Sequence, residues 1–271
     1  MPGLNRHKTK YMKIVKIIAG ILVVASFASC TLNEEIDLST PGKGQYLVHT
    51  DMSQALTMMK SMGGGQMPDS LKDKTIDTII SLASQLDSLD KPLSAEDQAY
   101  FKNGKLHMVM NMIENKFTME MKYPVKDIKD LKNFFKVNQY VDSVNKSKKK
   151  EAEPGEEGAP SAGGAPGLSG LSSMMSGMQG KGSPYIITDS SIQRVALTSE
   201  ALTESMGEQM KGAEMFMSQM IMSATIKLPR PVKRLEGKNV KLQEDKKTVF
   251  FTTSFSELKE DPENGSFLIV F

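Results

Sequence analysis

Few residues in this chain could perform nucleophilic or acid–base chemistry. It has one cysteine, Cys30, and three histidines, of which His49 and His107 lie beyond an apolar run near the start. Both of these histidines fall inside expected strands, where a histidine is more often structural than catalytic. No Gly-x-Ser-x-Gly motif supports a serine nucleophile. The sequence therefore favours a non-enzymatic protein, and a hydrolase with a triad assembled from distant residues stays open as a less favoured hypothesis.

Metal and phosphate chemistry have little support. Two histidines and one cysteine give no zinc-ligand spacing, and both the calcium-loop pattern and the Walker phosphate loop are missing. The sharper option is Cu(I) bound by thioethers, for which the candidates are Met215, Met217, Met220 and Met222. Met217 and Met220 also lie on the apolar stripe of an expected helix, and such stripes are more often core than ligand. We therefore expect no metal and no cofactor.

A basic segment near the C-terminus is the remaining candidate binding site. Its leading residues are Lys227, Arg230, Lys233 and Arg234, followed by Lys238 and Lys241. One interpretation is a charged sheet edge that prevents strand-to-strand aggregation. The other is a patch that binds lipid phosphates or acidic glycans. We favour the first and keep the second as a hypothesis.

The residues before Cys30 have the layout of a secretory signal peptide. A basic region precedes an apolar run, Ile17–Phe27, and two small residues, Ala28 and Ser29. The run is shorter than the ~20 apolar residues that a membrane-spanning helix needs. The alternative is a short N-terminal anchor helix followed by an incidental buried thiol. The basic residues are Arg6, Lys8, Lys10, Lys13 and Lys16.

Phe27-Ala28-Ser29-Cys30 resembles the lipobox of bacterial lipoproteins. The resemblance implies cleavage before Cys30 and attachment of diacylglycerol to its sulfur, so that the thiol is neither a catalyst nor half of a disulfide. Residues 1–29 are then the signal peptide and residues 30–43 a lipidated tether. Glu34-Glu35 in this tether resembles the surface-export tags of Bacteroidetes-type lipoproteins, with plain solubility as the alternative. We expect an outer-membrane protein, lipid-anchored through Cys30, on the periplasmic or cell-surface face.

Charge does not point to nucleic acid. The chain has 34 basic and 32 acidic residues, but residues 1–29 hold five of the basic residues and none of the acidic ones. The remainder is therefore slightly acidic, whereas nucleic-acid binding needs a concentrated basic face. Residues 146–183 are rich in Gly, Ser, Pro, Ala and Glu and are expected to be disordered. They separate two structured blocks, 44–145 and 184–271.

Hydrophobic periodicity predicts the elements of these blocks. The clearest is a hairpin over 106–123 in which Met112 faces Phe117 and Met110 faces Met119 across a turn at Glu114-Asn115. Apolar stripes predict helices over 76–89, 125–135 and 199–222. Ser254 and Glu257 have capping-box spacing and predict a short helix. Strands are expected over 44–52, 185–188, 194–197, 224–228, 239–243, 248–253 and 266–271.

Both blocks follow the order strand, helix, hairpin, short helix. This repeated order of elements predicts an α+β fold in which two similar halves form one antiparallel sheet with helices on one face. Two small α+β domains are the alternative.

Within the second block, Ala224–Leu228, Pro229, Lys233–Gly237 and Lys247-Thr248-Val249 resemble the C-terminal part of LppM-like lipoproteins. That resemblance implies a lipoprotein domain associated with envelope glycolipid. The expected partner is thus a glycolipid, another lipid or an envelope protein. The alternative role is that of a structural accessory subunit of an outer-membrane complex.

Overall fold

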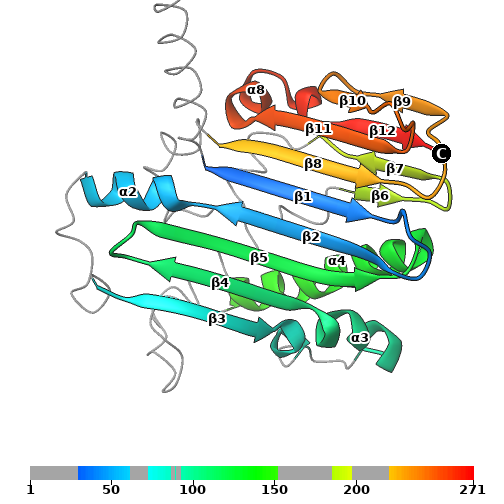
Figure 1. Ribbon diagram of the computed structural model, residues 1–271. Helices are drawn as coiled ribbons and strands as arrows, with labels where there is room; N and C mark the ends of the chain where they lie inside the picture. The colour runs from blue at the N-terminus through cyan, green and yellow to red at the C-terminus, as the bar shows by residue number, and fades with distance from the viewer. Residues whose placement is uncertain (1–29, 62–72, 87–88, 90–92, 152–184, 197–219) are drawn as a thin grey trace, which may run out of the picture.

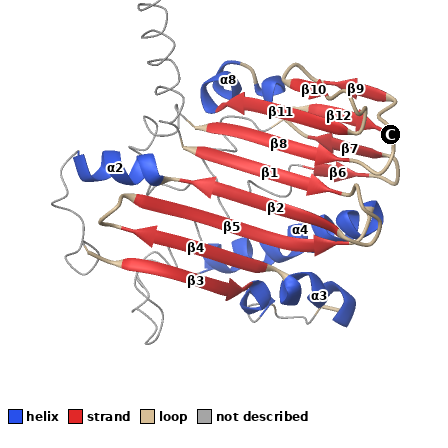
Figure 2. Cartoon of the chain, in the orientation of Figure 1, coloured by secondary structure: helices blue, strands red, loops and turns tan. Residues whose placement is uncertain are grey.

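The computed structural model describes residues 30–61, 73–86, 89, 93–151, 185–196 and 220–271. These residues form an α+β fold with a large sheet, a small sheet and four α-helices (Figure 1; Figure 2). The predicted fold class is confirmed. The expected disordered segment lies outside the described residues, except that residues 146–151 continue a helix.

The large sheet has eight strands in the order β10-β11-β8-β1-β2-β5-β4-β3. Neighbouring strands are antiparallel except for the central pair β1 and β8, so the sheet is mixed rather than purely antiparallel. Because β2, β3, β4 and β5 come from the first block and β8, β10 and β11 from the second, the two blocks share one sheet. The strands are β1 Thr31–Asp37, β2 Gly44–Asp51, β3 Thr75–Ser81, β4 Lys105–Asn111, β5 Lys116–Val125, β8 Ile221–Lys227, β10 Val240–Leu242 and β11 Thr248–Ser254.

A second layer covers one face of the large sheet. Figure 1 shows α3, α4 and the small sheet behind the large one. The small sheet is antiparallel, in the order β6-β7-β12-β9. Its strands are β6 Tyr185–Ile187, β7 Ser191–Arg194, β9 Arg234–Glu236 and β12 Phe267–Val270. The helices are α2 Ser53–Ser61, α3 Ala95–Asn103, α4 Ile128–Glu151 and α8 Phe255–Glu260, with 3-10 turns at Leu82–Leu86 and Pro262–Gly265.

Aromatic rings fill the space between the two layers. Nine rings form a connected series in which neighbouring centroids lie 4.4 to 6.4 Å apart. Such contacts add about 0.5–1.5 kcal/mol per pair to the burial of apolar area. The rings come from both sheets and from α3 and α4: Tyr46, Tyr100, Phe101, Tyr123, Phe134, Phe135, Tyr185, Phe251 and Phe267.

The predicted hairpin is present, but its register differs by two residues. Met110 pairs with Phe117 and Met108 with Met119, where the sequence predicted Met112 opposite Phe117. A shift of two keeps every side chain on its predicted face, because the side-chain period of a strand is two. The reason is a longer turn, residues 112–115, that ends at Asn115 with φ +54°.

The helix predicted over 76–89 is wrong. Thr75–Ser81 is the edge strand β3, followed by a 3-10 turn. Five of its seven residues are β-branched, which stiffens the side chains and favours a strand. The isoleucines at 76 and 80 fit helical spacing and strand alternation equally, and pairing with β4 decides between them.

The tether predicted over 30–43 is also wrong. Thr31–Asp37 is β1, in the middle of the large sheet, between β2 and β8. Leu32, Glu34 and Ile36 alternate with outward residues and point into the core. The glutamate concealed this alternation in the sequence, because an unpaired carboxylate is rarely buried.

Most other predicted elements are confirmed with small changes at their ends. The helix expected over 125–135 begins at Ile128, since Pro124 and Val125 end β5, and it continues to Glu151. The strand expected over 194–197 is misplaced, because β7 is Ser191–Arg194 and shares only Arg194 with it. The helix expected over 199–222 lies outside the described residues, apart from its last positions, which lead into and begin β8. The capping box that begins α8 is present in full. The second hairpin, β10–β11, and the terminal strand β12 are also found.

Candidate functional site

Cys30 lies immediately before β1, at the end of the large sheet where β8 also begins. Its carbonyl accepts a hydrogen bond from the backbone N–H of Ile221 at 2.9 Å. Its side chain is 4% exposed and points toward the first turn of α2, where the backbone N–H of Ala55 donates to the sulfur. Burial raises the pKa of this thiol, and the nearby Asp51 carboxylate adds to the increase.

Glu34 and Arg194 form an ion pair inside the protein. Arg194 Nη1 lies 2.8 Å from Glu34 Oε2, and their side chains are 3% and 8% exposed. The Tyr185 hydroxyl donates to the same carboxylate oxygen at 2.5 Å, and Arg194 also stacks over the Phe251 ring at 5.0 Å. Glu34 is in the large sheet and both partners are in the small sheet, so this cluster fastens the two sheets together.

The chemistry of this cluster is that of a structural ion pair. Burial, followed by the Glu34 charge, raises the pKa of Tyr185 well above its usual value. The pKa of Arg194 is also raised: burial alone would lower it, and the Glu34 charge outweighs that effect. The tyrosine therefore remains protonated and the arginine charged. Arg194 Nε has no hydrogen-bond partner among the described residues.

The sequence did not single out Arg194 or Tyr185 as site residues, and Glu34 was expected in a surface tag. Burial of Glu34 removes one half of the acidic pair from the folded surface, while its neighbour Glu35 points outward. No local signal in the sequence identifies the pair, because its members are 160 positions apart.

The uncovered side of the large sheet is called the open face below. No described helix or strand packs over it (Figure 2). Paired strands align one row of polar side chains across six strands of this face: His107, Glu120, His49, Asn33, Ser223 and Thr252.

Both predicted histidines belong to this row, each near a carboxylate. His107 Nε2 lies 2.8 Å from Asp77 Oδ1, and His49 Nδ1 lies 4.0 Å from Glu120 Oε2. Ser223 is two strands away from His49, or about 9.6 Å at ~4.8 Å per strand. Its hydroxyl donates to Asn33 Oδ1 at 2.6 Å. The row therefore holds histidine–carboxylate pairs without bringing this serine into contact with a histidine.

The four basic residues of the predicted patch have separate partners. Lys227 lies 2.6 Å from Glu35 and 3.5 Å from Asp37 on the open face. Arg230 stacks over the Phe271 ring, and Arg234 pairs with Glu236 at 2.5 Å. The backbone N–H of Lys233 donates to the Val270 carbonyl. Arg234 begins β9, an edge strand of the small sheet, and so fits the interpretation as a charged edge, whereas Lys227 ends β8, an inner strand of the large sheet.

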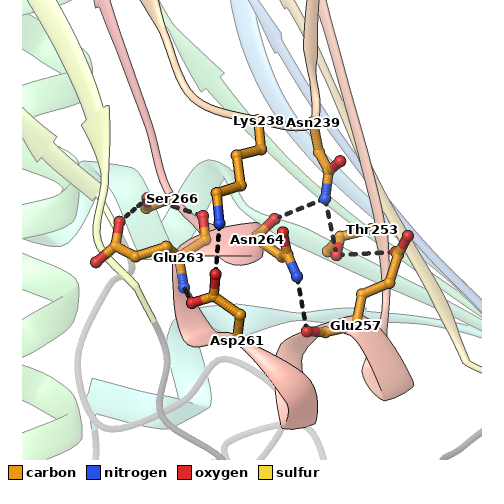
Figure 3. A network of polar contacts seen from close by, with 8 residues as sticks. All are labelled: Lys238, Asn239, Thr253, Glu257, Asp261, Glu263, Asn264 and Ser266. Carbon is orange, nitrogen blue, oxygen red and sulfur yellow. Dashed lines mark hydrogen bonds and ion pairs between the residues drawn. The ribbon is translucent and has the colours of Figure 1, made fainter.

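A polar network ties the loop after β9 to the end of α8 (Figure 3). Lys238 Nζ lies 2.5 Å from Asp261 Oδ2, and Asn239 donates to the Asn264 carbonyl at 3.1 Å. Asn264 in turn donates to the Glu257 carbonyl at 2.9 Å. These bonds satisfy the end of a short helix and fix the path of the chain into β12.

Within residues 30–61, 73–86, 93–151, 185–196 and 220–271, no three His, Cys, Asp or Glu side chains are placed to hold a metal ion. Met220 and Met222 are packed in the core, and the other two Cu(I) candidates lie outside the described residues. Among the helices described, none has the length and apolar character needed to cross a bilayer.

Comparison with known proteins adds no relative. No family model, no curated protein and no solved structure matches this chain. The lipobox and the LppM-like segment therefore stay predictions from the sequence.

Proposed function

We propose that this protein is a lipid-anchored, non-enzymatic component of the bacterial envelope that presents the open face of its large sheet to a protein partner. The role is that of an accessory subunit of an outer-membrane assembly. The observation that carries the proposal is the one-sided sheet: one face is covered by α3, α4 and the small sheet, and none of the described helices and strands covers the other.

The composition of the open face suits a reversible contact. Its apolar side chains include Ile79, Phe250 and Ile221, which are exposed but dispersed among polar rows. Charged side chains such as Lys227 and Glu35 are already ordered by ion pairs. A mixed polar and apolar surface of this kind resembles a non-obligate interface more than the apolar core of a permanent one.

The packed interior argues against a lipid or glycolipid held inside the fold. A ligand of this kind would have to lie between the large sheet and the helices that cover it. That space contains the connected aromatic rings of both layers, including Tyr123 and Phe134 at 4.4 Å. The proposal therefore places the partner on the surface of the sheet.

The buried side chain of Cys30 is compatible with lipidation, because the residue can turn without disturbing β1. The hydrogen bond from Ile221 uses the carbonyl of Cys30, so it constrains the atoms on the β1 side of the residue. In a chain cleaved before Cys30, rotation about the Cα–C bond can turn the side chain into the direction that the amino group held, while the amino group takes that of the Cα hydrogen. The thioether then leaves α2 while β1 keeps its pairing.

The test uses the native bacterium and two readouts. Metabolic labelling with palmitate is expected to label the wild-type chain and not Cys30→Ala, which should also leave the membrane fraction. A photoreactive residue at Thr225, on the open face, is expected to crosslink to a defined protein. The same residue at Lys136, on the outer surface of α4, is the matched control. Absence of label, or equal crosslinking from both positions, would overturn the proposal.

A further inference from the structure

The strand ends next to Cys30 form one end of the molecule. Register places Thr31 level with Asp51 on one side and with Ile221 on the other. Asp51 is level with Thr118, and Ile221 with Ser254. The residues that precede β1 and follow β2 therefore leave the sheet at the same end, which we call the Cys30 end.

The β4–β5 hairpin projects beyond this level. Its last pair, Asn111 and Lys116, lies two residues past Thr118, or about 7 Å at ~3.4 Å per residue. The turn of residues 112–115 extends further still. At its tip is Ile113, which is 70% exposed, the highest value among the large hydrophobic side chains described.

The turn holds Ile113 in a fixed position. The Asn111 side chain accepts hydrogen bonds from the backbone N–H groups of Ile113 and Glu114 at 3.0 and 3.1 Å. Lys60, near the end of α2, donates to the Met112 carbonyl and to Asn115 Oδ1. An exposed isoleucine on a turn braced from both sides is a preformed apolar tip, because little conformational entropy is lost when it is buried.

Basic side chains flank this tip. The Lys60 amine lies at the turn, the exposed Lys116 follows it directly, and Glu114 is the only acidic residue within the turn. Lysines around an apolar side chain suit the boundary between lipid headgroups and acyl chains, where amines contact phosphates and the apolar group enters the hydrocarbon.

We propose that the Cys30 end rests on the bilayer, with Ile113 inserted at the interface beside the lipid attached to Cys30. The inference rests on the proposed lipidation. Because β1 begins one residue after Cys30, no flexible spacer separates the lipid from the folded sheet. The strands then rise from the membrane, and the open face points sideways into the aqueous space, where a protein can reach it.

The chain contains no tryptophan, so one introduced tryptophan is the sole indole reporter. The experiment places it at Ile113 or at Ile79 in the full-length protein. Ile79 is the matched control because it is 66% exposed but lies four residues from Thr75, where β3 begins at the Cys30 end. This separation is about 13 Å along the strand. Each protein is purified from membranes and reconstituted in vesicles of phosphatidylethanolamine and phosphatidylglycerol, with and without brominated phosphatidylcholine. Palmitate label is measured in the same preparations.

Ile113→Trp is expected to emit at shorter wavelength than Ile79→Trp and to lose most of its emission to the brominated lipid. Ile79→Trp should keep its emission and be quenched by aqueous acrylamide. Labelled protein in which both tryptophans are equally accessible to acrylamide would overturn the orientation and leave the lipid anchor intact. Protein without palmitate label would overturn the anchor and the orientation together.

Discussion

Glu34 and Arg194 meet at 2.8 Å in the interior of the protein although 160 positions separate them in the chain. Glu34 belongs to the central strand of the large sheet, and Arg194 ends β7 of the small sheet. Tyr185 adds a hydrogen bond to the same carboxylate. The interface between the two sheets thus contains a charge pair within a largely apolar core, and either charge alone would be costly there.

Glu34→Gln is expected to destabilise the fold strongly. The change leaves Arg194 buried without its counter-charge, and breaking a buried pair in this way costs about 3–5 kcal/mol. The matched control is Glu35→Gln, the next residue on the opposite face of β1. Its partner Lys227 is partly exposed, so the loss should be about 0–1 kcal/mol. Urea unfolding followed by circular dichroism measures the free energy of unfolding of both variants. Equal losses of this free energy would contradict the structural role of Glu34.

The Cys30 thiol is expected to react slowly in the folded, non-acylated chain. Its burial raises its pKa, so little thiolate is present, and α2 covers the sulfur. Alkylation by iodoacetamide should be at least about tenfold slower in the folded chain than in the chain unfolded by urea. A tenfold difference corresponds to a free energy of about 1.4 kcal/mol for the local unfolding that exposes the thiol. A Cys30→Ala chain with Lys136→Cys on the exposed face of α4 serves as control and should react at similar rates in both conditions.

Gly44→Ala is expected to cost about 1–3 kcal/mol through overpacking. An added Cβ would lie 2.6 Å from the Val125 carbonyl oxygen and 2.7 Å from that of Asp37, both of them backbone atoms. Gly42 provides the comparison, since a Cβ there meets nothing within 4 Å although its φ is +73°. Asparagine tolerates this conformation, so Gly42→Asn should change the free energy of unfolding by no more than about 0.5 kcal/mol.

Stability in acid is expected to depend on Glu257. The Ser254 backbone N–H donates to its carboxylate at 2.7 Å and holds its pKa below the usual value, while partial burial opposes this. Because the folded pKa is the lower one, the unfolded chain takes up the proton first as the pH falls. The stabilisation of the fold by the Glu257 carboxylate is complete above about pH 4.5 and is lost as the pH falls through the lowered pKa.

Glu257→Gln should therefore flatten the decline in stability between about pH 5 and pH 3. Glu260→Gln, at the exposed end of the same helix, should leave the decline unchanged. Ser254→Ala removes the other half of the capping box and should cost about 0.5–2 kcal/mol near pH 7. Thermal unfolding of the three variants across this pH range gives the comparison, and an unchanged pH profile for Glu257→Gln would refute the assignment.

The sequence by itself determined the elements whose pattern is local. The hairpin at residues 106–123, the capping box at Ser254 and the strand Gly44–Asp51 follow from alternation and from spacing within a few residues. The faces of the hairpin were predicted correctly as well, because an even shift in register leaves them unchanged.

Tertiary structure alone decided the role of β1, of β3 and of the charged residues. Burial of Glu34 requires Arg194 from a distant strand, and without that partner the segment resembles a polar tether. Thr75–Ser81 becomes a strand because β4 offers an edge to pair with. Lys227 of the basic segment forms ion pairs because Glu35 and Asp37 of β1 lie beside it only after folding. In each case the deciding interaction is non-local, and local periodicity carries no information about it.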